Sequence, residues 1–174
     1  MFKNLRENIQ EKRQKNRYQM REKLISFGDD YWIQDEQGHR AFFVDGKMLR
    51  IRKTLFFKDL HGQELLKIQE RFLHVRDTMA IEHGDQVVAK VHSALIAPLR
   101  DRFKIDIPGS SDMVAQGNFL HHEFSIKQDG NEVAEVSKRW FRLADTYGVE
   151  IDPGQNDILI LAITTCIDAM TEEK

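Results

Sequence analysis

The chain has 174 residues, a length that fits one domain with one sizeable core. Hydrophobic residues make up 41% and charged residues 31%, and the net charge of −2 gives no overall drive toward nucleic acid or acidic membranes. The single cysteine, Cys166, excludes an intrachain disulfide and a zinc site built from several cysteines. No apolar signal-peptide core is visible near residue 1, so we expect a cytoplasmic protein.

The first segment, residues 1–19, is polar and basic and differs from the rest of the chain. Phe2, Leu5 and Ile9 recur at helical spacing, which predicts a short amphipathic helix or a loose tail. We therefore expect the folded domain to comprise residues 20–174.

Short alternating stretches separated by turn signals occupy residues 23 to 151. Apolar and polar residues alternate in residues 48–52, 89–92 and 124–127, which is typical of strands with one face in a core. Glycine-containing pairs that favour tight turns punctuate these stretches: Gln37-Gly38, Asp45-Gly46, His61-Gly62, Gly84-Asp85 and Asp129-Gly130. This pattern predicts an antiparallel β-meander, sandwich or barrel.

The last segment departs from the strand pattern. Residues 158–167 are apolar on every side, and Asn156 or Asp157 can cap a helix that begins there. We predict a helix at about residues 156–170, far short of the roughly 20 apolar residues that a membrane span needs. A helix without a polar face must be covered all round, so the sheet is expected to curl around it, with Asp168 near solvent at the helix end.

Residues capable of catalysis or metal binding show no recognisable arrangement. The seven histidines lack zinc-site spacing, and the adjacent His121 and His122 would face opposite sides of a strand. Cys166 lies among apolar residues, where a thiol has a raised pKa and behaves as a small hydrophobe. Serine-nucleophile and glycine-rich phosphate-binding motifs are absent from the sequence. We expect neither an enzyme, a cofactor nor a metal site.

Basic residues offer the one candidate binding surface. Rows of Lys and Arg at period two can hold phosphates, although the more common explanation is that they are the solvated outer faces of strands, interleaved with acids. Trp140 and Phe141, which lie among the last of these cations, are expected to pack in the core. The candidate residues for an anionic head group are Arg50, Arg52, Lys53, Arg100, Arg102, Lys138, Arg139 and Arg142.

The order of three motifs resembles that of the LURP-one-related family, a part of the tubby C-terminal-like superfamily that also includes phospholipid scramblases. The motifs are VSKRWF at residues 136–141, DTYGVEI at residues 145–151, and the apolar segment that follows. The resemblance implies a mainly β fold: a closed antiparallel barrel of about twelve strands around a C-terminal helix. The resemblance also implies binding to lipid head groups, since tubby-like relatives bind phosphoinositide head groups on the barrel exterior. A spanning segment after the helix is missing, which argues against scramblase activity.

The function that we expect is a non-enzymatic binding or adaptor module, cytoplasmic or peripheral to a membrane. Its partner would be an anionic phospholipid surface or another protein, met through the barrel exterior. One alternative is a small-molecule-binding protein or enzyme with a pocket at the barrel mouth. A second alternative is a transcription-related role as in tubby-like proteins, although the net charge makes nucleic acid an unexpected partner. The sequence leaves the ligand and the oligomeric state open.

Overall fold

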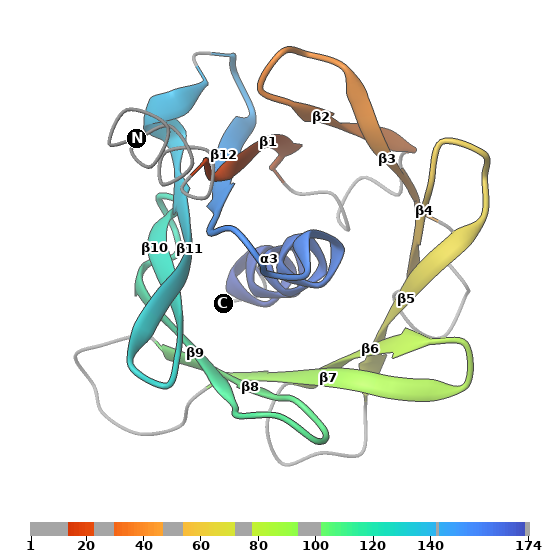
Figure 1. Ribbon diagram of the computed structural model, residues 1–174, viewed down its shortest axis with the longest axis vertical. Helices are drawn as coiled ribbons and strands as arrows, with labels where there is room; N and C mark the ends of the chain where they lie inside the picture. Colours follow the sequence, from red (N-terminus) through yellow and green to blue (C-terminus); the bar gives the residue numbers. More distant parts are fainter. Residues whose placement is uncertain are drawn as a thin grey trace, which may run out of the picture.

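The computed structural model is a barrel of antiparallel strands closed around one central helix (Figure 1). It describes residues 14–22, 30–46, 54–71, 78–93, 102–141 and 143–172. The mainly β fold expected from the sequence, a closed barrel with a C-terminal helix, is confirmed.

Twelve strands form the barrel wall within the described ranges, and each pairs with its neighbours in the chain. The barrel closes where the first strand pairs with the last, through a register that joins Asn16 to Ile151 and Arg21 to Thr146. The strands are β1 (Asn16–Arg21), β2 (Tyr31–Asp35), β3 (Arg40–Asp45), β4 (Thr54–Lys58), β5 (Glu64–Arg71), β6 (Thr78–His83), β7 (Gln86–Ser93), β8 (Arg102–Asp106), β9 (Met113–Asn118), β10 (Glu123–Gln128), β11 (Asn131–Ser137) and β12 (Thr146–Ile151). A 3₁₀ turn, η1 (Lys138–Trp140), precedes β12, and the helix α3 (Asp157–Glu172) follows it.

Alternation along the strands decides which side chains enter the barrel. In β10, Phe124 and Ile126 are buried in the core while Ser125 and Lys127 point outward, as the sequence pattern predicted for residues 124–127. Apolar residues from all twelve of these strands contribute to the same core cluster. Since that cluster also contains the inner residues of α3, the helix fills the space that the wall encloses.

Polar contacts at one end of the barrel cap the start of α3 and fix its position against β1. The Asn156 side chain accepts a hydrogen bond from the Leu159 backbone N–H, so Asn156 is the helix cap. The Tyr18 hydroxyl of β1 donates to the Asp157 carboxylate at 2.6 Å. Residues 160–170 are buried throughout, and the hydroxyls of Thr164 and Thr165 donate to carbonyls one turn back, as expected inside an apolar helix.

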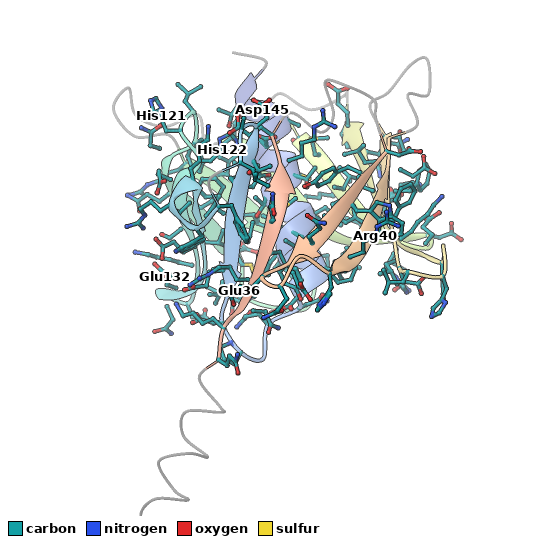
Figure 2. The ribbon with its side chains drawn as sticks, turned by 90° about the horizontal axis from the view of Figure 1, so that it is seen from above. Glu36, Arg40, His121, His122, Glu132 and Asp145 are labelled. Atoms are coloured by element: carbon teal, nitrogen blue, oxygen red, sulfur yellow. The ribbon has the colours of Figure 1, made fainter. Side chains whose placement is uncertain are left out.

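The two ends of the barrel are named here after the helix termini. The α3 N-terminal end carries the starts of β1 and α3 and the tight hairpin turns, and the α3 C-terminal end carries the β9–β10 turn and the connection from η1 to β12. Figure 2 shows His121, His122 and Asp145 together at one end, with Glu36 and Glu132 toward the other. Asp145 occupies a turn with φ of +58°, and its carbonyl accepts a hydrogen bond from the Glu22 backbone N–H.

Several boundaries differ from those expected. β1 begins at Asn16, inside the segment of residues 1–19 that was expected to lie outside the barrel, because residues 16–21 pair with β12. Asp45-Gly46 does not form a tight hairpin turn, since Asp45 pairs with Phe56 of β4, which lies 11 positions further along the chain. The strand expected at residues 48–52 and the expected helix at the start of the chain lie outside the described residues.

Candidate binding surface

The basic residues predicted from the sequence do not form one patch in the described structure. Arg50, Arg52, Lys53, Arg100 and Arg142 lie outside the described residues. Of the remaining three, Arg102 begins β8, whereas Lys138 and Arg139 belong to η1, three strands further round the wall. Figure 1 shows β8 and β11, the strand that leads into η1, on different parts of the barrel circumference. Among the three described cations, the structure therefore separates Arg102 from the η1 group of Lys138 and Arg139.

The η1 group is neutralised by neighbouring carboxylates. The Lys138 ammonium pairs with Glu22, and the Arg139 guanidinium pairs with Glu135 at 2.8 Å. Ser137 caps η1 by accepting from the Arg139 backbone N–H at 3.1 Å, and its hydroxyl donates to Glu123. A phosphate at this position would have to displace carboxylates that already occupy the guanidinium and ammonium donors.

The aromatic residues of the VSKRWF motif lie on the outside of the barrel, so the expectation that Trp140 and Phe141 pack in the core is wrong. Both are half-buried against Gly148, whose neighbours in β12, Tyr147 and Val149, point inward. A Cβ atom built on Gly148 would lie 2.8 Å from the Trp140 ring and 3.0 Å from the Phe141 ring. Glycine at this position is what lets the aromatic pair lie flat on the wall.

Arg17 of β1 extends this outer surface, which we call the η1 face and define by Arg17, Arg139, Trp140, Gly148 and Glu150. The Arg17 guanidinium lies 4.9 Å from the centre of the Trp140 ring and pairs with Glu150. Burial tends to raise the pKa of the Glu150 carboxyl, but its hydrogen bonds with Arg17 and with Lys15 outweigh burial and lower it. The η1 face is thus a closed network of charges around an aromatic pair.

Arg102, the remaining described cation, lies beside polar side chains whose hydrogen-bond donors no described residue uses. Arg102, Gln116 and Ser125 lie side by side on β8, β9 and β10, because Arg102 pairs with Gln116 and Gln116 with Ser125. Lys127 follows two residues after Ser125 on the same outer face of β10. No side-chain hydrogen bond or ion pair joins any of these four to another residue that the structure describes. We call Arg102, Gln116, Ser125 and Lys127 the β8–β10 donor cluster.

Acidic residues border the donor cluster on two sides: on β11, Glu135 is the register partner of Ser125 and Glu132 that of Lys127, and a further set surrounds Lys104 on β8. Lys104 pairs with Asp106 at 3.0 Å and with Asp112 at 3.2 Å. Asp106 also accepts from His92 Nε2 at 2.7 Å. Burial acts to raise the pKa of Asp106, but the hydrogen bonds with Lys104 and His92 outweigh it and lower the pKa. Lys104 is thus matched by two carboxylates, whereas Arg102 and Lys127 form no ion pair with a described residue.

Three of the four members of the donor cluster were not predicted. Gln116 and Ser125 are uncharged, and Lys127 lies outside the basic rows that the sequence displays. The alternation around Phe124 and Ile126 did indicate that Ser125 and Lys127 face outward. Their meeting with Arg102 depends on strand register between segments that are distant in sequence.

A polar cleft of about 230 Å³ lies at the α3 N-terminal end. It is lined by the start of β1 and the β2–β3 turn, including Lys15, Arg17, Asp35 and Glu36. Ligand pockets are usually larger, about 300 Å³ or more, and mostly apolar. Because Arg17 is paired with Glu36 and Glu150, this cleft offers few unpaired groups to a small molecule.

The adjacent histidines lie in the β9–β10 turn, and not on a strand. His122 is only 6% exposed, its Nε2 lies 2.5 Å from the Asp168 carboxylate, and its ring stacks on Tyr147 at 4.4 Å. Asp168 is also 6% exposed, so the expectation that it lies near solvent is wrong. The pair ties the last turns of α3 to the barrel wall, because His122 reaches over the α3 C-terminal end.

Groups of three or more potential metal ligands do not occur among the residues that the structure describes. Cys166 is completely buried, and burial raises the pKa of its thiol, as expected for a cysteine inside the apolar helix. Within the described ranges, no helix is long and apolar enough to cross a membrane.

Comparison with known proteins agrees with the fold and the motif order. The profile of the LURP-one-related family matches residues 16–168. The uncharacterized protein YxjI of Bacillus subtilis is 24% identical over 149 residues, which cover 86% of this chain and 90% of YxjI. An X-ray structure of an Arabidopsis thaliana protein superposes with a TM-score of 0.63 at 12% identity, covering 91% of this chain and 92% of that one, which shows a shared fold. The chain belongs to the LURP-one-related family.

Proposed function

We propose that this LURP-one-related protein is a non-enzymatic module that binds the anionic phosphates of phospholipid head groups through the outer face of its barrel. The observation that carries the proposal is the β8–β10 donor cluster. Its four side chains present a guanidinium, an amide, a hydroxyl and an ammonium on three neighbouring strands. None of these donors is used by another described residue.

The donor cluster is better suited to binding a phosphate than the η1 face is. Phosphate oxygens accept several hydrogen bonds, and a guanidinium can donate two of them in parallel. Arg102 and Ser125 lie two strands apart, about 10 Å between backbones, a span that long side chains close around one head group. Because the whole chain has a net charge of −2, attraction to a negative surface depends on this local cluster.

A vesicle experiment tests the proposal. We expect the protein to sediment at low salt with phosphatidylcholine vesicles that contain a phosphoinositide, and to stay in solution with phosphatidylcholine alone. The double variant Arg102→Gln/Lys127→Gln should bind roughly thirtyfold more weakly, since each surface cation contributes about 1 kcal/mol. Binding should also weaken as salt is added.

Arg40 provides the matched control. It is an exposed arginine at the start of β3, on the other side of the barrel from the donor cluster (Figures 1 and 2), and its guanidinium lies 4.7 Å from the centre of the Trp32 ring. Arg40→Gln should leave sedimentation unchanged. Absence of enrichment with the phosphoinositide at low salt, or an equal loss in Arg40→Gln, would overturn the proposal. Tighter binding to RNA or DNA than to vesicles would favour the nucleic-acid alternative.

A further inference from the structure

Two leucines at the α3 C-terminal end are unusually exposed. Leu120 is 69% exposed in the β9–β10 turn, and Leu143 is 64% exposed in the connection between η1 and β12. They are the two most exposed large apolar side chains among the described residues, followed by Leu60 at 56%. Leu60 lies in the β4–β5 turn, at the opposite end of the barrel.

The two leucines belong to neighbouring connections. β9, β10, β11 and β12 are consecutive in the wall, so the β9–β10 turn and the connection into β12 emerge side by side. The stack of His122 on Tyr147 joins the β9–β10 turn to the first residues of β12, next to the connection that carries Leu143. The backbone carbonyl of Leu143 accepts a hydrogen bond from the Thr146 hydroxyl at 2.8 Å, and this bond fixes the connection at the start of β12.

The Leu120 turn also closes the β9–β10 hairpin, which carries Gln116, Ser125 and Lys127 of the donor cluster. Asn118 and Glu123 form the first pair of that hairpin, and Gln116 and Ser125 form the third. Two further pairs correspond to about 7 Å along the strands. The head-group layer of one leaflet is about 5 to 8 Å thick, the difference between the hydrocarbon core and the whole bilayer divided by two. A leucine at the tip and donors at this depth match the two layers of a membrane surface.

We propose that the α3 C-terminal end of the barrel docks onto a lipid bilayer, with Leu120 and Leu143 inserted below the head groups and the donor cluster level with the phosphates. This inference rests on the proposed function and adds the orientation of the protein and the apolar part of the contact. The docking is shallow and reversible, because two leucine side chains bury little apolar area compared with a spanning helix.

The test separates insertion from phosphate binding by using two probes. The double variant Leu120→Asn/Leu143→Asn should bind a soluble inositol phosphate as the unmodified protein does. Its binding to phosphoinositide-containing phosphatidylcholine vesicles should fall about tenfold or more, the expected consequence of losing burial of apolar side chains. Leu60→Asn, the matched control at the opposite end, should keep both activities.

A labelling experiment reports the orientation independently. An environment-sensitive fluorophore on Leu120→Cys should shift to the blue when vesicles are added, and the same label on Leu60→Cys should not; labelling is selective because Cys166 is fully buried. Full vesicle binding by the double leucine variant, or a shift only at position 60, would contradict insertion while leaving phosphate binding intact. Failure of the unmodified protein to bind the soluble inositol phosphate would instead remove the proposed function.

Discussion

The inner and outer faces of the barrel wall use their side chains in opposite ways. Inside, apolar residues of the wall and of α3 pack into one core in which Leu161, Ile163 and Cys166 have no exposed surface. Outside, the η1 face is held by ion pairs, whereas the donor cluster has none with described residues. The difference teaches that a charged outer surface is not automatically available to a ligand, because its cations can already be paired with carboxylates as they are on the η1 face.

The interior should be the most sensitive to substitution. Cys166→Asp places a carboxylate in the middle of the apolar helix, where it has no solvent, and we expect the free energy of unfolding to fall by about 4 kcal/mol or more. Thermal denaturation followed by circular dichroism measures the loss. Cys166→Ala, which removes only the sulfur atom, should cost about 1 kcal/mol. Unchanged thermal stability in Cys166→Asp would mean that the helix is not central.

The buried polar pair should come next. His122→Ala removes the ring that meets the Asp168 carboxylate at 2.5 Å and stacks on Tyr147, and should destabilise by about 3 kcal/mol. The double variant His122→Phe/Asp168→Leu removes both polar groups, keeps much of the volume, and should recover part of the loss. Chemical denaturation measures the free energy of unfolding of both variants. An unchanged free energy of unfolding in His122→Ala would show that the pair does not secure α3.

The packing of Trp140 and Phe141 on Gly148 should contribute to stability on the outer face of the barrel. Gly148→Val should lower the free energy of unfolding by about 2 kcal/mol, because the new side chain collides with Trp140 and Phe141. Intrinsic fluorescence should show Trp140 moving into water. If both stability and fluorescence stay unchanged, the aromatic pair does not pack as described.

The ion pairs of the η1 face should give a smaller, pH-dependent effect. Since the pKa of Glu150 is lowered in the folded protein, its contribution to stability is present above the unfolded value of about 4.3 and is lost as pH falls through the folded value. Glu150→Gln should therefore cost about 1 kcal/mol at neutral pH and progressively less in acid. Denaturation curves at several pH values measure this, and a cost that grows on acidification would contradict the sign.

Local sequence patterns were enough to predict individual strands and the helix, whereas the closed barrel of about twelve strands followed from the family resemblance. Alternation at residues 89–92 and 124–127 predicted strands that the structure confirms in β7 and β10, and the capped apolar segment predicted α3. These features were predictable because each depends on residues a few positions apart.

Contacts between distant residues could not be predicted in the same way. Asp168 meets His122 across 46 positions, so its burial leaves no local signal. Trp140 and Phe141 were assigned to the core by their apolarity alone, and only their contact with Gly148 shows that they lie outside. The donor cluster depends on strand register, which brings Arg102, Gln116 and Ser125 side by side from three different strands.

The most direct test of the central claim is to map where a phosphate ligand binds. Backbone amide chemical shifts of isotopically labelled protein can be followed while a soluble inositol phosphate is added. Our account predicts shift changes at Arg102, Gln116, Ser125 and Lys127, and none at Arg17 or Arg139, whose guanidinium groups are already paired. Changes centred on the η1 face, or no changes at all, would contradict the assignment of phosphate binding to the β8–β10 donor cluster.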